Sequence, residues 1–186
     1  MLCFDRGSFD YQARYCEENV WRLLARSEIG KRCAWAVIVA SSSDFFVALR
    51  QQVGRPGDGL VCWDYHVFAV VDDPDGVRLA LDLDSSLPFP CPLERYLAES
   101  FPPMRHPHRQ PIFRVVPAAD YLAGLASDRS HMRKSDGTYS SPPPPWPPLG
   151  GGKSNTLMAW IDVTTKSRGV LFDLAGMMAF AGPLPG

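Results

Sequence analysis

The pattern of apolar and polar residues is most regular between positions 61 and 84. Residues 61–71 and 77–84 are rich in β-branched and aromatic side chains, and residues 72–76 (Asp-Asp-Pro-Asp-Gly) are typical of a turn. The pattern therefore predicts two antiparallel strands. Alternate positions form a continuous apolar face, which we expect to pack in the core: Val61, Trp63, Tyr65, Val67, Ala69, Val71, Val77, Leu79, Leu81 and Leu83. The opposite face is polar and charged, and we expect it to carry the chemistry.

The length of the turn decides which residues of the two strands face each other. If residues 72–76 form the loop, Val71 faces Val77 and His66 lies opposite Asp82. Directly opposed side chains on one face of an antiparallel pair have Cβ atoms about 4.5–5.5 Å apart. A carboxylate at that distance can hold an imidazole in one tautomer and stabilise its charged form. A turn of another length would change this pairing.

The rest of the chain predicts a mixture of helices and strands in one domain, because 186 residues are too few for two ordinary domains. Helical spacing of apolar residues begins near Tyr15. We expect further strands at residues 33–40, 45–49, 112–116 and 169–174, and further helices at 93–101, 118–126 and 155–161. A connection rich in proline and glycine occupies about 141–153, and residues from 175 onward have no clear period.

Composition excludes several classes of function. The net charge is −1, and no long run of basic residues indicates binding to nucleic acid. No apolar run reaches the roughly 18 residues of a membrane span, and no secretory signal is evident. The five cysteines are therefore expected to be reduced thiols in the cytoplasm or nucleus. His106 and His108 lack further ligands at useful spacing, so no metal site is expected.

Cys16 is the candidate nucleophile, because it begins the first predicted helix. Unpaired backbone N–H groups and the macrodipole at a helix N-terminus favour a thiolate. Glu17 and Glu18 act against this by adding negative potential. The alternative is that Cys16 is a small buried side chain without reactivity. His131 competes with His66 as a possible base, although no strand places a carboxylate opposite it.

The residues Cys16, His66 and Asp82 follow the order of nucleophile, base and acid in papain-like and transglutaminase-like cysteine enzymes. An imidazole activates the thiol, a carboxylate orients the imidazole, and helix-terminal N–H groups stabilise an oxyanion. This order also permits a cysteine protease or a transglutaminase-like acyl transferase. A third alternative is a non-catalytic adaptor whose proline run, residues 142–148, binds a proline-reading domain.

Several long stretches of unusual composition resemble the protein N-terminal glutamine amidohydrolase family. The resemblance is good over about residues 11–148 and loose beyond Gly150. The matching stretches lie at residues 15–21 (Tyr-Cys-Glu-Glu-Asn-Val-Trp), 51–59 (Gln-Gln-Val-Gly-Arg-Pro-Gly-Asp-Gly), 63–66 (Trp-Asp-Tyr-His), 82–84 with 87–91, 113–115 and 126–132.

The resemblance implies a fold, an activity and a triad. The expected fold is α+β: a single-domain α-β-α sandwich over residues 1–186 with a mainly antiparallel sheet and a papain-like core, in which segment 154–186 is the least certain part. The implied reaction converts the side chain of an N-terminal glutamine on a protein or peptide to glutamate and releases ammonia. In this family the step feeds the N-degron pathway. The triad falls on Cys16, His66 and Asp82, and we expect no cofactor and a monomer in the cytoplasm and nucleus.

An enzyme that selects a terminal residue must recognise the free α-amine, which is a cation. The expected register places Asp64 opposite Asp84, on the same face as His66. Like charges that face each other are unfavourable, and a substrate ammonium would neutralise them. The alternative is that these carboxylates cap backbone groups or pair with an arginine such as Arg55.

Overall fold

A computed structural model describes residues 4–30, 32–152, 154–166 and 168–182. Its main element is a six-stranded sheet with the order β6-β5-β4-β1-β7-β8, in which every neighbouring pair is antiparallel. The strands are β1 (Ala34–Ala40), β4 (Tyr65–Asp72), β5 (Arg78–Leu81), β6 (Cys91–Pro92), β7 (Ile112–Pro117) and β8 (Val170–Phe172). A separate two-stranded sheet pairs β2 (Phe46–Ala48) with β3 (Val61–Trp63).

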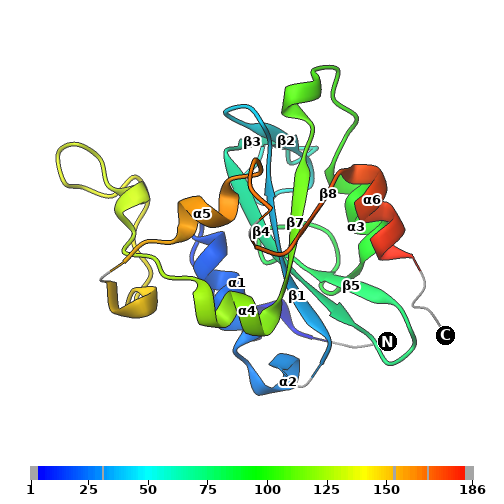
Figure 1. Ribbon diagram of the computed structural model, residues 1–186, viewed down its shortest axis with the longest axis horizontal. Coiled ribbons are helices and arrows are strands. Elements are labelled where there is room, and N and C mark those ends of the chain that lie inside the picture. The colour runs from blue at the N-terminus through cyan, green and yellow to red at the C-terminus, as the bar shows by residue number, and fades with distance from the viewer. Residues whose placement is uncertain (1–3, 31, 153, 167, 183–186) are drawn as a thin grey trace.

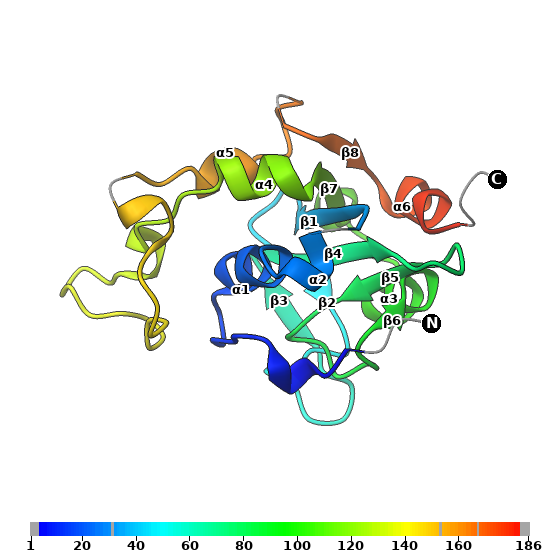
Figure 2. The ribbon, with the colours of Figure 1, turned by 90° about the horizontal axis from the view of Figure 1, so that it is seen from below.

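Helices cover both faces of the six-stranded sheet (Figures 1 and 2). The α-helices are α1 (Cys16–Leu24), α2 (Ser27–Gly30), α3 (Leu93–Ser100), α4 (Ala118–Gly124), α5 (Leu157–Ile161) and α6 (Leu174–Ala181). Short 3₁₀ turns occur at Arg6–Ser8, Pro107–Arg109, Ser130–Met132 and Leu149–Gly152. Side chains of α1, α4 and α5 share one core with one face of the sheet, and those of α3 and α6 share a second core with the other face. The expected three layers and antiparallel sheet are confirmed.

The sheet buries both faces of β4, which corrects the expectation of one apolar and one polar face. Tyr65, Val67, Ala69 and Val71 pack in the core beneath α1, as predicted. The alternate positions Phe68 and Val70 belong to the second core, beneath α3 and α6. The sequence of β4 and β5 could not reveal this second layer, because the helix that covers it, α3, follows these two strands in the chain.

The register between β4 and β5 differs by two residues from the expected one. Val71 pairs with Leu79 rather than with Val77. The strand continues to Asp72, which pairs with Arg78, and the Asp73 N–H donates to the Val77 carbonyl, so the turn lies one residue later than expected. Because side chains alternate with a period of two, this shift keeps the residues of β4 and β5 on their predicted faces. The expected direct opposition of His66 and Asp82 is therefore wrong, although their shared face is right.

Residues 61–72 are also not one continuous strand. The chain breaks at Asp64, so β3 pairs with β2 while β4 belongs to the main sheet. The Asp64 carboxylate accepts a hydrogen bond from the Tyr65 N–H at 2.9 Å, which satisfies the backbone at the break. Val61 and Trp63, which were predicted to share the core face of Tyr65, pack instead against the second core, where the Trp63 ring stacks on His66.

The segment after Gly150 packs on both sides of the sheet. Strand β8 pairs with β7, and Trp160 of α5 and Met177 of α6 are buried in the two cores. Helix α6 was not predicted, because its sequence is apolar with little helical periodicity. Cys3 and residues 183–186 lie outside the described residues. Within the described part of the chain, no helix has the length and apolar character needed to cross a membrane.

Candidate functional site

The buried pair of His66 and Asp82 lies where β4 extends beyond the end of β5. The His66 Nε2 atom lies 3.1 Å from Asp82 Oδ2, with both side chains at most 2 % exposed. The pairing between β4 and β5 ends at Ala69 and Leu81. The chain then leaves the strand, and the Asp82 side chain contacts His66. The predicted partnership is thus confirmed by a route other than direct strand pairing. Neither ring nitrogen of His66 has an aligned hydrogen-bond partner among the described residues, so Asp82 meets the histidine as an ion-pair partner.

Several groups hold the Asp82 carboxylate in place. The Tyr96 hydroxyl donates to Asp82 Oδ2 at 2.8 Å, and the Asp84 N–H donates to Oδ1 at 2.9 Å. The Gln51 amide lies 3.4 Å from Oδ2 and accepts from the Trp63 indole N–H at 3.4 Å. The indole ring stacks on the His66 imidazole, with 5.7 Å between ring centroids and 11° between planes.

Gln51 and Tyr96 are therefore supporting residues that the sequence did not identify as part of the site. Tyr96 is fully buried in α3 and looks like an ordinary core aromatic residue. The sequence could have indicated its role only through its hydroxyl group, because a hydroxyl at a buried position needs a hydrogen-bond partner. Gln51 lies in the matching stretch 51–59, but nothing in that stretch indicated a contact with Asp82.

The histidine and the aspartate shift each other's pKa in opposite directions. Burial by itself would lower the pKa of His66, but the charge and close contact of Asp82, with the charge of Asp84, raise it above its ordinary value. Burial would raise the pKa of Asp82, but His66, the Asp84 N–H and the Tyr96 hydroxyl lower it. Both shifts favour the charged pair of imidazolium and carboxylate.

Cys16 is the first residue of α1, as predicted, and its side chain is buried against β4. A backbone hydrogen bond from Val67, the residue after His66, reaches the thiol. The expectation that the helix start stabilises a thiolate is wrong for the free protein. Burial, followed by the charges of Glu17 and Asp84, raises the pKa of Cys16 well above its ordinary value. Both effects oppose formation of the thiolate in the free protein.

The two glutamates that follow Cys16 are fully buried and have different partners. Glu18 forms a bidentate ion pair with Arg129, at 2.7 and 2.8 Å, and accepts from the Trp146 indole at 2.7 Å. Arg129 also donates to the Pro144 and Trp146 carbonyls. These bonds anchor the proline-rich connection to α1 although it extends away from the sheet (Figure 1).

His131 also has a carboxylate partner, which the sequence did not indicate. Its Nε2 lies 3.4 Å from Glu17 Oε1 and 3.3 Å from the Tyr65 hydroxyl, which itself donates to Glu17 Oε2 at 2.9 Å. Asp128, the nearest acid in sequence, instead accepts from the Ser130 N–H. His131 thus belongs to a cluster with Glu17 and Tyr65 rather than to the pair of His66 and Asp82.

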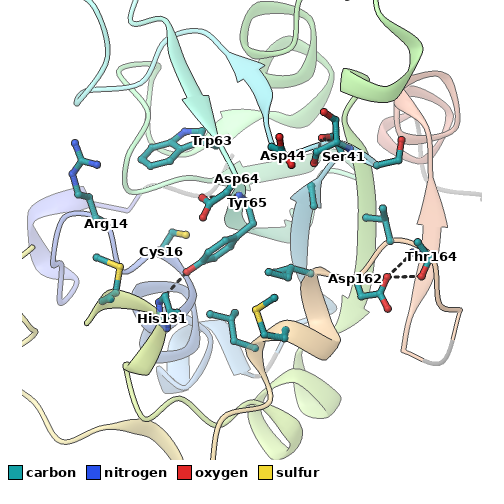
Figure 3. A pocket seen from close by; sticks show the side chains of 18 of the residues that line it. Arg14, Cys16, Ser41, Asp44, Trp63, Asp64, Tyr65, His131, Asp162 and Thr164 are labelled. Carbon is teal, nitrogen blue, oxygen red and sulfur yellow. Dashed lines mark hydrogen bonds between the residues drawn. The ribbon is translucent and has the colours of Figure 1, made fainter. Parts of the chain in front are cut away.

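A pocket of about 640 Å³ opens above Cys16 (Figure 3). Asp64 and Asp84 both line it, so the two predicted substrate-binding residues share one cavity with the predicted nucleophile. They do not face each other across a strand pair, because Asp64 lies between β3 and β4 and Asp84 lies in the turn after β5. Trp63, Tyr65 and His131 line the same end of the pocket, and Asp44 and Asp162 line the far end.

Asp84 is the more deeply buried of the two carboxylates, at 2 % exposure. It accepts a hydrogen bond from the Tyr11 hydroxyl at 2.6 Å. Burial, together with the nearby Asp82 charge, raises its pKa although His66 and Tyr11 act in the opposite direction. Arg55 is not its partner, because that guanidinium pairs with Asp58. One donor atom from each of His66, Asp82 and Asp84 lies within 4.8 Å of the others.

These features together favour a hydrolase that acts on amides through a thiol. They combine a buried thiol at a helix start, a paired histidine and aspartate, and an acidic pocket above the thiol. Comparison with known sequences narrows this class. The sequence profile described as N-terminal glutamine amidase matches residues 11–181, and the chain belongs to this family.

Curated relatives give the same result. A protein N-terminal glutamine amidohydrolase of Drosophila grimshawi is 40 % identical over 147 residues, which are 75 % of this chain and 71 % of the relative. The proteins of the same name from Drosophila mojavensis and Bos taurus are 41 % and 39 % identical over 155 residues, with 80 % of this chain and 74 % of each relative covered.

Proposed function

We propose that this protein deamidates the side chain of an N-terminal glutamine on proteins and peptides, giving N-terminal glutamate and ammonia. Membership of the N-terminal glutamine amidase family carries this proposal. The pocket supports it, because a thiol and acidic residues line it, and the buried pair of His66 and Asp82 lies next to Asp84 of that lining. We assign Cys16 as nucleophile, His66 as acid and base, and Asp82 as the residue that orients His66.

In the first half of the reaction, the Cys16 thiol loses its proton to solvent when the substrate binds, and the thiolate attacks the side-chain amide carbon of glutamine beside the His66 imidazolium. The new C–S bond forms as the carbonyl becomes an oxyanion, and the Cys16 backbone N–H at the start of α1 donates to it. The His66 imidazolium then protonates the leaving nitrogen, the C–N bond breaks, and ammonia departs. Asp82 lies beside Nε2 of His66, which leaves Nδ1 for this exchange.

In the second half, His66 removes a proton from a water molecule that attacks the thioester. The C–S bond breaks, the thiol regains a proton, and glutamate leaves. No cofactor enters this sequence. The three layers, the helix that begins at Cys16 and the strand that carries His66 agree with a papain-like core, which we propose for this chain.

Substrate binding can itself activate the thiol. Asp84 raises the pKa of Cys16, and it has no cationic partner except the neighbouring His66 among the described residues. We assign Asp84, with Asp64 at the rim of the pocket, to the α-ammonium group of the terminal glutamine. A bound ammonium would neutralise Asp84 and lower the pKa of the thiol when the amide arrives. N-terminal asparagine is one methylene shorter, so its carbonyl would stop short of the sulfur.

An ammonia-release assay tests this function. We expect release from peptides with a free N-terminal glutamine, and little from peptides with N-terminal asparagine, internal glutamine or N-acetylglutamine. Cleavage of the peptide bond, or transfer to an added amine in preference to water, would instead identify a protease or an acyl transferase. Ammonia release with none of these side reactions excludes both classes and the non-catalytic adaptor.

Asparagine variants test the assignment of the amine site. In Asp84→Asn the ratio of kcat/KM between free-amine and N-acetylated peptides should fall by about tenfold or more, because a buried charged hydrogen bond is lost. Asp64→Asn should lower this ratio less, since Asp64 is exposed. If neither ratio changes, the amine is recognised elsewhere. We further propose a monomer in the cytoplasm and nucleus that supplies N-terminal glutamate to the N-degron pathway.

A further inference from the structure

The pocket continues well past the residues that the proposed reaction uses. From Cys16 and Asp64 it extends across Tyr65 to the end of α5 and the turn that follows (Figure 3). Its volume of about 640 Å³ is in the range that holds a drug-sized molecule rather than one side chain. The distal half must therefore be filled by something other than the terminal glutamine.

The distal half has an apolar floor and one acidic end. Helix α5 and the following turn contribute Leu157, Met158, Ile161 and Val163 to the lining. Met158 is 65 % exposed, which is unusual for a large apolar side chain on a wall of a pocket. Asp44 and Asp162 line the same end (Figure 3), and Arg14 is the only arginine or lysine among the lining residues, at the opposite end.

Hydrogen bonds from the main sheet hold α5 and the turn that follows it in place. The guanidinium of Arg114, buried in β7, donates to the Trp160 carbonyl at 2.8 Å and to the Thr165 carbonyl at 2.9 Å. It also donates to the carbonyls of Asp162 and Arg168. One side chain thus fixes the end of α5 and the turn to the main sheet. A surface ordered in advance loses little entropy when a ligand binds.

We infer that this distal groove binds the residues that follow the first two of the substrate, and that it prefers an apolar residue followed by a basic one. This inference rests on the proposed function. The occupant is the substrate chain because the groove is continuous with the Cys16 pocket, and an extended peptide advances about 3.3 Å per residue. Met158 and Ile161 contact an apolar side chain at position 3, and Asp44 and Asp162 attract a Lys or Arg at position 4.

The test compares octapeptides that begin Gln-Gly and differ only at positions 3 and 4. For the wild type we expect kcat/KM to be about fivefold higher with Leu than with Glu at position 3, because the contact is apolar and partly exposed. At position 4 we expect about threefold higher values with Lys than with Glu, as for a pair of exposed charges. Met158→Glu should abolish the first preference, and Asp162→Asn with Asp44→Asn should reduce the second.

Two matched variants serve as controls. Asp136 accepts from the Thr138 N–H and hydroxyl at 2.9 and 2.6 Å, as Asp162 does from Thr164, but it lies outside the pocket. Asp136→Asn should leave the position 4 ratio unchanged. Val170 is 57 % exposed on β8 and does not line the pocket, so Val170→Glu should leave the position 3 ratio unchanged.

The outcomes separate the inference from the proposed function. If no peptide releases ammonia, including the dipeptide Gln-Gly, the proposed function fails. If all octapeptides react equally in the wild type, or if the control variants change the ratios as much as Met158→Glu does, the groove inference fails alone. It also fails if Met158→Glu changes only the oligomeric state, since the surface would then be a contact between copies of the chain.

Discussion

Asp82 Oδ2 lies 3.1 Å from His66 Nε2, and neither ring nitrogen of His66 has an aligned hydrogen-bond partner among the described residues. The carboxylate thus lies beside Nε2, which leaves Nδ1 for proton exchange in the proposed mechanism. The contact lies below the stacked ring of Trp63, away from solvent. This asymmetry of the imidazole supports the proposed roles, since a base must be oriented by one group while it serves another.

Replacement of the proposed nucleophile should abolish activity without loss of the fold. In Cys16→Ala we expect ammonia release to fall by about 10⁴-fold or more, because no other group can form the thioester. Cys62→Ser is the matched control, since Cys62 is exposed on β3. Its rate should equal that of the wild type. A Cys16→Ala protein that retains near-normal turnover and a normal thermal unfolding curve would exclude the thioester mechanism.

Replacement of Asp82 should affect both the rate and its pH dependence. Asp82→Asn should lower kcat by about 10²–10⁴-fold, because an amide can leave the imidazole in the wrong tautomer. Asp82 raises the pKa of His66, so in this variant the pH at which His66 loses its proton should fall. A pH–rate profile measures this.

Tyr96→Phe gives a graded version of the same experiment. It removes only one hydrogen bond to Asp82, so the rate should fall severalfold and the pH profile should shift less than in Asp82→Asn. A structural role for Tyr96 alone would lower the unfolding temperature and leave the pH profile unchanged.

The pH dependence of thiol alkylation tests the electrostatics around Cys16. Burial and the charges of Glu17 and Asp84 raise the pKa of the thiol, so alkylation by iodoacetamide should require a higher pH than for an ordinary cysteine. In Asp84→Asn one of these negative charges is absent, and the alkylation profile should move to lower pH. Asp58→Asn, at an exposed carboxylate paired with Arg55, should leave it in place. A shift to higher pH in Asp84→Asn would contradict this account.

The ion pair of Glu18 and Arg129, which joins α1 to the proline-rich connection, should contribute strongly to the free energy of unfolding. Arg129→Met leaves Glu18 buried without its cation, and we expect a loss of about 3 kcal/mol in the free energy of unfolding. Arg95→Met removes an exposed pair with Glu99 within α3, and its denaturation midpoint should not change measurably. Urea denaturation compares the two. Equal midpoints for both variants would show that the connection is not held by this pair.

The sequence by itself determined which residues share a face of the sheet and which residue begins the first helix. Both follow from local periodicity: side chains alternate along a strand, so His66 and Asp82 stay on one face in either register. Apolar spacing after Tyr15 likewise fixed Cys16 at the start of α1. The resemblance to a family then connected these residues to a reaction.

The tertiary structure alone decided the register, the second core and the surroundings of the thiol. The hydrogen bonds of a turn set the register, and they differ in energy too little for the sequence to rank them. Helix α3 buries the face of His66 and supplies Tyr96 from outside the hairpin. Glu18 meets Arg129 across 111 residues, and α5 reaches the pocket of Cys16 only through its packing on the sheet. Such contacts depend on how distant elements pack, which local periodicity does not encode.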